Sequence, residues 1–337
     1  MLSHVFHRWE RRLASAATDR VVRPFEWGAD WIPGLDRYVG DVEEQRLSAW
    51  AADAVANSET FFRLDPCDDY TLNGDRLSFP SAVCTPHLSN NTVRARWFPG
   101  SSPLGQRRAV LVLPQWNADA GGHVGLCRLI NRYGMSALRL SLPYHDDRKP
   151  PELRRADYIV SANVGRTAQV CRQAVLDARR AIHWLARQGY ESIGILGTSL
   201  GSCLSMLTAA HEPLVRTAAL NHISPYFADV VWSGLSTEHV RQGLNGHIAL
   251  DDLRRIWMPI SPFPYLERMR GKKVLLVYAR YDLTFPVELS RALVAEFRRL
   301  GVPHELAVLP CGHYSTGKTP FNWMDGLALC RFLNRSL

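Results

Sequence analysis

Ser199 lies in the sequence Gly197-Thr198-Ser199-Leu200-Gly201, whose pattern favours a reactive hydroxyl. An apolar run, 193–196, precedes this pentapeptide, and a helix-like run, 200–210, follows it. A serine on a sharp turn between a strand and a helix has its hydroxyl exposed at the end of the sheet. The turn needs small residues two positions either side, because the strand and helix backbones approach closely, and both positions are glycine. We therefore take Ser199 as a candidate nucleophile.

A serine hydroxyl is a weak nucleophile unless a nearby base removes its proton. Two later segments supply candidates for that base and for the group that orients it. The apolar strand-like segment 273–279 ends just before Asp282, and the segment 306–310 ends just before His313. Side chains that follow the strands of an open α/β sheet meet at one edge of it. We expect His313 to act as the base and Asp282 to orient its imidazole.

Strand-like and helix-like segments alternate through most of the chain. This pattern predicts an α/β fold, with a mostly parallel central sheet and helices on both faces. An Asn73-Gly74 turn between strand-like arms predicts that the sheet begins with antiparallel strands. The longest predicted helix, 162–188, has small and apolar residues at i+3/i+4 spacing. The predicted strands that follow the hairpin are 92–98, 109–113, 136–142, 192–196, 217–223, 273–279 and 306–310.

The chain order Ser199, Asp282, His313 resembles that of the α/β-hydrolase superfamily. The resemblance covers residues from about 105 to 330, and Asp282-Leu-Thr-Phe-Pro286 is similar to the acid turn of that family. It implies an α/β-hydrolase fold with a lid inserted between two strands. We expect an N-terminal extension at 1–65, an α/β-hydrolase domain at 66–337, and the lid at 223–272. A rigid structural cap is the other interpretation of that insert.

A narrower resemblance rests on the segment Pro143-Tyr-His-Asp-Asp-Arg-Lys-Pro150, on Trp184-Leu185 and on Gly189-Tyr190. These residues are similar to the abhydrolase domain-containing proteins numbered eighteen. The chain departs from that group at His145-Asp146, where the group has Tyr-Gly. It also has Ser202 where many hydrolases have a second glycine.

A tetrahedral intermediate needs two donors for its oxyanion. The N–H of Leu200 is the expected first donor, since it follows the nucleophile. By analogy with related enzymes, the second comes from the loop after Leu113: the N–H of Trp116, or else that of Gln115. We expect five residues to bind substrate: Trp116 itself, Thr198 beside the nucleophile, Tyr144 after strand 136–142, and Trp232 and Trp257 in the insert.

Other residues near the predicted strand ends could have a functional role or an ordinary structural one. His145, Asp146 and Asp147 could suggest a metal site, but a further convergent ligand is needed, so we favour a solvated loop. His123 could help to bind substrate, but we favour a surface position. Trp116 could line an acyl pocket or simply pack its own loop. We expect no metal and no organic cofactor.

The composition is that of a globular protein, with 337 residues, 46% hydrophobic and 21% charged. The formal charge of +8 comes from dispersed arginine pairs, which favour solvated helix faces over a nucleic-acid interface. The seven cysteines show no C-x-x-C or zinc-ligand spacing, which favours free thiols in a reducing compartment. With no secretory signal and no long apolar run, we expect a cytoplasmic protein.

The N-terminal residues Phe6, Trp9 and Leu13 recur at helical spacing among arginines. Such a face could touch a membrane surface, although packing against the body is the preferred interpretation. A second helix is expected at 42–57, with an apolar face containing Leu47, Trp50, Ala51 and Ala54. Half-buried tryptophans in this part of the chain are typical of a segment anchored on a domain.

Together these residues predict a serine hydrolase that acts on carboxylic esters of small molecules or lipids. A serine peptidase on the same fold is the second hypothesis, although no propeller-like segment precedes the domain. A non-enzymatic scaffold is the third, but such relatives usually lose the nucleophile or the base. Substrate length, natural substrate and oligomeric state depend on pocket and surface shape, which residue identity alone does not determine.

Overall fold

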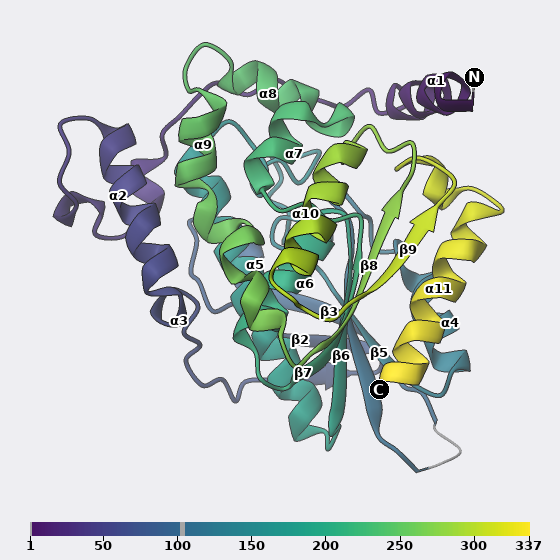
Figure 1. Cartoon of the computed structure of the whole chain (residues 1–337). Coiled ribbons are helices and arrows are strands. Elements are labelled where there is room, and N and C mark those ends of the chain that lie inside the picture. The colour runs from purple at the N-terminus through teal and green to yellow at the C-terminus, as the bar shows by residue number, and fades with distance from the viewer. Residues whose placement is uncertain (1, 102–104) are drawn as a thin grey trace.

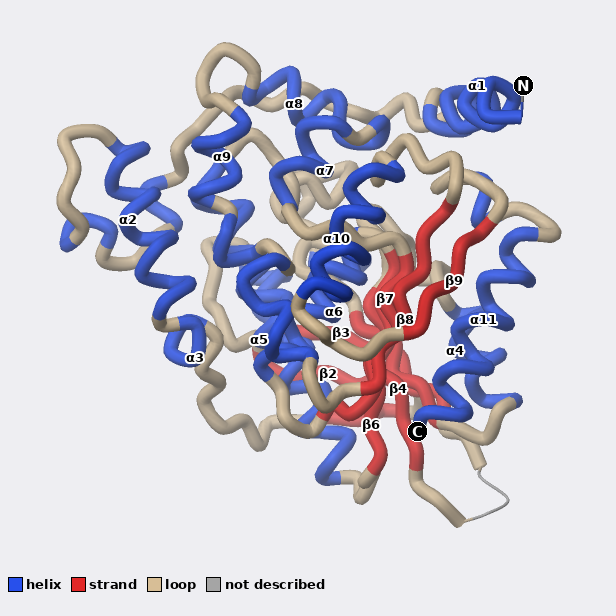
Figure 2. The backbone as a smooth tube through the Cα atoms, viewed as in Figure 1, coloured by secondary structure: helices blue, strands red, loops and turns tan. Residues whose placement is uncertain are grey.

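The computed structural model describes residues 2–101 and 105–337, and its centre is a nine-stranded sheet (Figures 1 and 2). The strand order is β1-β2-β3-β5-β4-β6-β7-β8-β9. The first three strands are antiparallel to their neighbours, and the remaining pairs are parallel. The predicted α/β architecture is therefore confirmed. The strands are β1 Thr71–Asn73, β2 Arg76–Pro80, β3 Thr92–Phe98, β4 Arg108–Leu113, β5 Ser136–Leu140, β6 Ser192–Thr198, β7 Val215–Asn221, β8 Lys273–Ala279 and β9 Glu305–Leu309.

Helices cover both faces of the sheet. Figure 1 shows α4 and α11 on one side and α5, α6 and α10 on the other. The helices are α1 Leu2–Ala14, α2 Glu43–Ala56, α3 Ser58–Phe61, α4 Val124–Arg132, α5 Val164–Arg187, α6 Leu200–His211, α7 Phe227–Ser233, α8 Glu238–Leu244, α9 Leu250–Ile256, α10 Val287–Arg299 and α11 Phe321–Ser336. None of the helices in the described part of the chain is both long and apolar enough to span a bilayer.

The two faces of the sheet build two apolar cores, because successive strand residues point to opposite sides. In β4, Leu111 and Leu113 enter the core shared with α5 and α6. Val110 and Val112 enter the core shared with α4 and α11. Burial on both faces explains why this strand is a continuous apolar run rather than an alternating one. The central strands are thus held rigidly, and so are the loops that follow them.

The first helix packs on the body of the protein near the ends of β8 and β9. The Phe6 ring stacks on that of Tyr281, with 4.5 Å between ring centroids. Glu10 is fully buried and accepts hydrogen bonds from the backbone N–H groups of Tyr314 at 2.8 Å and Ser315 at 2.9 Å. Phe6, on the face that could touch a membrane, thus packs on the protein itself, and membrane contact stays a prediction. In α2, the predicted buried face is confirmed.

The segment 223–272 folds into α7, α8, α9 and short 3₁₀ turns rather than extending the sheet. Trp257 and Met269 lie in its core, and α7 packs against α8 and α9. The behaviour of this segment as a lid and the domain boundaries 1–65 and 66–337 stay predictions.

Candidate active site

Ser199 occupies the turn between β6 and α6 with φ 57° and ψ −121°. This backbone conformation is rare for a residue with a side chain and is typical of functional turns. A Cβ on Gly197 would lie 2.1 Å from the carbonyl oxygen of Gly201, and one on Gly201 would lie 2.2 Å from that of Leu113. Glycine is therefore required at both positions. The Ser199 N–H donates to the carbonyl of Asn221 in β7 at 2.8 Å, which ties the turn to the neighbouring strand.

Asp282 and His313 meet beyond the ends of β8 and β9. The Asp282 Oδ2 atom lies 3.0 Å from His313 Nδ1. The other carboxylate oxygen accepts hydrogen bonds from the backbone N–H groups of Thr284 at 2.8 Å and Phe285 at 2.7 Å. The Phe285 ring stacks against the imidazole of His313, with 5.5 Å between centroids. The imidazole is thus oriented by one charged group and one apolar surface.

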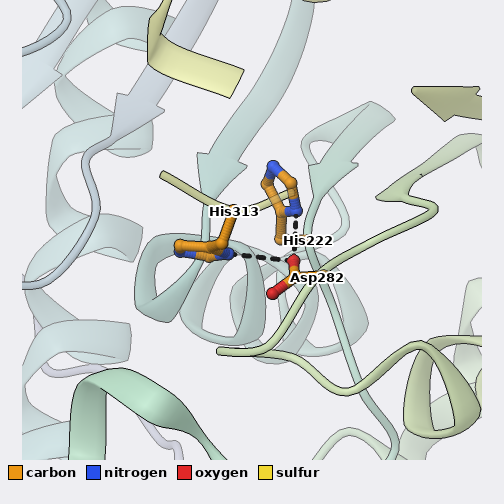
Figure 3. A group of neighbouring side chains, drawn as sticks. All are labelled: His222, Asp282 and His313. Carbon is orange, nitrogen blue, oxygen red and sulfur yellow. Dashed lines mark hydrogen bonds and ion pairs between the residues drawn. The ribbon is translucent and has the colours of Figure 1, made fainter. Parts of the chain in front are cut away.

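A second histidine, His222, bonds to the same carboxylate oxygen. Its Nδ1 atom lies 2.9 Å from Asp282 Oδ2, and Figure 3 shows both rings directed at that one atom. Burial alone would raise the pKa of Asp282, but the two imidazoles and their hydrogen bonds hold it well below its ordinary value. Asp282 is therefore an ionised, buried carboxylate.

Ser199 and His313 line one cavity of about 1050 Å³. Apolar and polar side chains both line it, and they come from α4, α7 and α11 among other elements. No hydrogen bond joins the Ser199 hydroxyl to His313 within the described chain. Such bonds are often long in enzymes without substrate and shorten only in the complex. The cavity therefore brings together a hydroxyl and an imidazole that an ester could reach at once.

Three backbone N–H groups near Ser199 have no hydrogen-bond acceptor among the described residues: those of Leu200, Gln115 and Trp116. All three residues line the cavity. The neighbouring amide of Asn117 is already bonded, since it donates to His145 Nε2 at 2.9 Å. The loop after β4 thus offers the two amides that were expected as alternatives.

Part of the sequence matches a known protein family. A family model described as "Alpha/beta hydrolase domain containing 18" matches residues 126–240, about a third of the chain. All the segments on which the narrower resemblance rests lie within this match. The chain has the α/β-hydrolase fold, and its residues 126–240 are similar to that family.

Solved structures share this fold at low identity. An acetyl xylan esterase from Paenibacillus sp. R4 matches 90% of this chain and 98% of its own, with a TM-score of 0.60 and 14% identity. An acylaminoacyl peptidase from Pyrococcus horikoshii matches 83% of this chain at the same score and identity, but only 44% of its own length. A lipase in an open form matches 77% of this chain and 97% of its own, with a TM-score of 0.56 and 12% identity. These likenesses show the fold alone.

Two of the other expected substrate-binding residues line the cavity. The Trp116 ring stacks parallel to that of His239 at 5.7 Å between centroids, and its indole N–H donates to the carbonyl of Ala156 at 2.9 Å. Trp116 therefore packs its loop and lines the cavity at once. Thr198 also lines the cavity, and its hydroxyl lies 3.0 Å from His123 Nε2. His123 was expected at the surface, but it is half-buried against the cavity.

Three expected substrate-binding residues lie elsewhere in the protein. Trp257 is fully buried and donates its indole N–H to the carbonyl of Val164 at 3.0 Å, so it is part of the core. Tyr144 is also fully buried, and its hydroxyl lies 3.0 Å from His87 Nδ1. Trp232 is half-buried and packs against the main core, outside the cavity lining. These expectations were wrong: none of the three lines the cavity, and each packs in or against the main core.

The solvated loop expected at His145 and Asp146 is also wrong. His145 is buried between Asn117 and the carbonyl of Pro143. Asp146 pairs with the buried Arg139, with 2.6 Å between Oδ2 and Nη1. Only Asp147 is exposed. The three residues do not converge on one point, because each of the first two is held by a different partner.

Sequence reasoning missed His222 and Asp325. In the described residues, His222, Asp282 and His313 form the one group of histidine and acidic side chains close enough together to hold a metal ion, although both Nδ1 atoms are already bonded to the carboxylate. The absence of a metal stays a prediction. Asp325 lines the cavity from α11, and burial raises its pKa to about 6. His222 comes directly after β7, so the strand-end rule that selected Asp282 could have found it.

Proposed function

We propose that this α/β-hydrolase is a serine hydrolase that cleaves carboxylic esters. Ser199 is the nucleophile, His313 the general base and Asp282 the acid that orients it. The observation that carries the proposal is the bond between Asp282 Oδ2 and His313 Nδ1 at 3.0 Å, beside the cavity that Ser199 also lines. Since the ionised carboxylate only accepts hydrogen bonds, His313 carries its proton on Nδ1. Its Nε2 lone pair is then free to take the serine proton.

The reaction proceeds through an acyl-enzyme. The Ser199 oxygen attacks the ester carbonyl carbon while His313 Nε2 takes the hydroxyl proton. When the tetrahedral intermediate collapses, the bond to the alcohol oxygen breaks, and that oxygen receives the proton from His313. A water molecule then attacks the acyl carbon and gives a proton to His313. The bond between the acyl carbon and the Ser199 oxygen breaks, that oxygen takes the proton back from His313, and the carboxylic acid leaves. Asp282 stays ionised and stabilises the imidazolium in both halves.

The oxyanion of each intermediate is stabilised by two backbone amides. Leu200 N–H is the first, because it is the first amide of α6 and has no acceptor of its own among the described residues. Trp116 N–H is our choice for the second, with Gln115 N–H as the alternative. Donors that are already in place before the charge develops contribute most to the rate.

The cavity supports an ester with an apolar acyl group. Phe227, Val230 and Val231 line it from α7, and Leu126 and Leu129 line it from α4. Trp116 and Thr198 line the same cavity as Ser199. We propose a small-molecule or lipid ester as the substrate, and no nucleic-acid partner. Acetyl xylan esterase and lipase structures show that the same fold carries ester chemistry in other proteins.

Hydrolysis of p-nitrophenyl esters from acetate to palmitate tests the proposal. We expect turnover by the wild-type protein and none by Ser199→Ala, with Ser15→Ala as a control because that hydroxyl is exposed just after α1. A fluorophosphonate should label wild type and fail to label Ser199→Ala. Labelling that persists in Ser199→Ala would place the nucleophile at another residue.

A serine peptidase would use the same three residues, and the shared fold of acylaminoacyl peptidase is the observation that keeps this alternative. Matched p-nitroanilides with the same acyl groups separate the two. Ester turnover without anilide turnover supports the proposal. Anilide turnover at a comparable kcat/KM would favour the peptidase.

A further inference from the structure

His222 is held rigidly by its own backbone. It follows β7 with φ 58°, its N–H donates to the carbonyl of Val277 in β8 at 2.8 Å, and its side chain is about 1% exposed. Its carbonyl oxygen lies 2.6 Å from the Ser202 hydroxyl, which lies equally close to the carbonyl of Ser199. The backbone of His222 is therefore tied to β8 and, through Ser202, to the turn that carries Ser199.

All hydrogen-bonding directions of the Asp282 carboxylate are occupied. Oδ1 accepts the two backbone amides of Thr284 and Phe285, and Oδ2 accepts Nδ1–H from His222 and from His313. Both imidazoles must carry a proton on Nδ1, because an ionised carboxylate has no hydrogen to donate. The two rings lie 4.6 Å apart between centroids. They therefore compete for a single oxygen atom.

The charges around His222 come from four elements. Asp282 follows β8, His313 follows β9, Asp325 lies on α11 and Glu10 on α1. Burial opposes a charge on His222, but its hydrogen bond to Asp282 and the negative charges of Asp282, Asp325 and Glu10 raise its pKa above the ordinary value. A proton on His222 would give Asp282 a cationic partner before His313 receives the proton of Ser199.

We propose that His222 is a positioning residue that holds Asp282 in place and couples its own protonation to that of His313. The effect on catalysis rests on the proposed function, in which His313 is the base for Ser199. While His222 is neutral, Asp282 is held by a fourth donor and can stabilise the His313 cation. Once His222 is protonated, the two cations share one carboxylate oxygen at close range, and proton transfer to His313 becomes unfavourable. The hydrolase is then active only when both imidazoles are neutral.

Two variants separate the role of His222 as a hydrogen-bond donor from the effect of its protonation. His222→Asn keeps a side-chain N–H near the position of Nδ1 but cannot be protonated, and His222→Leu removes both properties. We expect the acid limb of log kcat/KM to approach a slope of two in wild type and of one in His222→Asn. At high pH, His222→Asn should stay within about threefold of wild-type kcat, whereas His222→Leu should fall about 10-fold through loss of a charge-assisted bond. His304→Asn, on the opposite end of β9, is the matched control.

Nuclear magnetic resonance gives a readout that does not need turnover. In wild type, the ring protons of His222 should titrate with two inflections, since its protonation responds to the state of the ring that shares its carboxylate oxygen. In His313→Asn they should titrate with one. An identical single titration of His222 in both proteins, or a wild-type acid limb with a slope of one, would overturn the inference. Absence of any Ser199-dependent hydrolysis would refute the proposed function alone, because the titration of His222 still decides whether the pair is coupled.

Discussion

The Nε2 atom of His145 accepts a hydrogen bond from the backbone N–H of Asn117 at 2.9 Å. The other ring nitrogen lies 2.9 Å from the carbonyl of Pro143 and so carries the proton. Burial lowers the pKa of His145 to about 4, which keeps the ring neutral and Nε2 an acceptor. Asn117 has φ 60°, and its side-chain oxygen accepts the N–H of Ala156 at 2.7 Å. A buried imidazole thus holds the loop that carries the candidate oxyanion amides.

Replacement of His145 should impair catalysis more than binding. His145→Leu removes the acceptor of the Asn117 amide, so the 115–117 loop loses its fixed orientation. We expect kcat to fall by about 10-fold with a smaller change in KM, because the loop amides act on the transition state. Steady-state kinetics on the preferred p-nitrophenyl ester measure both constants, beside His304→Leu as a control. An unchanged kcat would show that this loop does not supply the second oxyanion donor.

Acid should destabilise the protein through the same histidine. The unfolded chain binds a proton at His145 near pH 6.5, whereas the folded protein binds it only near pH 4. Between these values the unfolded state holds more protons, so stability falls as pH falls. The contribution of His145 should be about 2 kcal/mol smaller at pH 5 than at pH 7. Urea unfolding at the two pH values measures it, and His145→Leu should lose correspondingly less; an equal loss in the variant would contradict the assignment.

Asp282→Asn should abolish most turnover without unfolding the protein. An amide in this position cannot stabilise the His313 cation, and it no longer requires the proton on Nδ1. We expect kcat to fall by about 10⁴-fold. Asp147→Asn, an exposed carboxylate on another loop, is the control. Circular dichroism should be unchanged in both variants, and near-normal turnover in Asp282→Asn would assign the acid to another residue.

Gly201→Ala should destabilise the fold itself. The new Cβ would lie 2.2 Å from the carbonyl oxygen of Leu113 and 2.5 Å from that of Pro114, and backbone atoms cannot rotate away. We expect a loss of about 3 kcal/mol in the free energy of unfolding. Gly125→Ala in α4 is the matched control, because its Cβ would meet nothing within 4 Å. Denaturant unfolding of both variants measures the difference; equal stabilities would contradict the close approach at Gly201.

Much of the fold could be predicted because its signals are local. The buried strands β4, β6 and β8 are continuous apolar runs, and α5 has a helical apolar pattern that ends before Gly189, at φ 81°. Ser199, Asp282 and His313 were selected because each follows a strand directly. His222 meets the same criterion, but the predicted strand 217–223 included it, whereas β7 ends at Asn221. An error of two residues at a strand end therefore concealed it.

Burial of single side chains was harder to predict, since it depends on segments far away in the chain. Trp257 and Tyr144 look like pocket aromatics in sequence, yet partners near residues 164 and 87 hold them in the interior. His145 and Asp146 look like a solvated loop, yet Asn117 and Arg139 bind them. Asn117 lies 28 residues from His145, and Arg139 lies seven residues from Asp146 on the preceding strand, so periodicity carried no signal of either contact.

The sequence by itself determined the order Ser199, Asp282, His313, the glycines around the serine and the parallel sheet that places the three residues at one edge. Only the tertiary structure decided that His222 and His313, 60 and 31 residues from Asp282, bond to the same carboxylate oxygen. The physical reason is that strand periodicity determines where a residue leaves the sheet. The direction of its ring is determined by backbone torsions and by packing between elements that are distant in the chain.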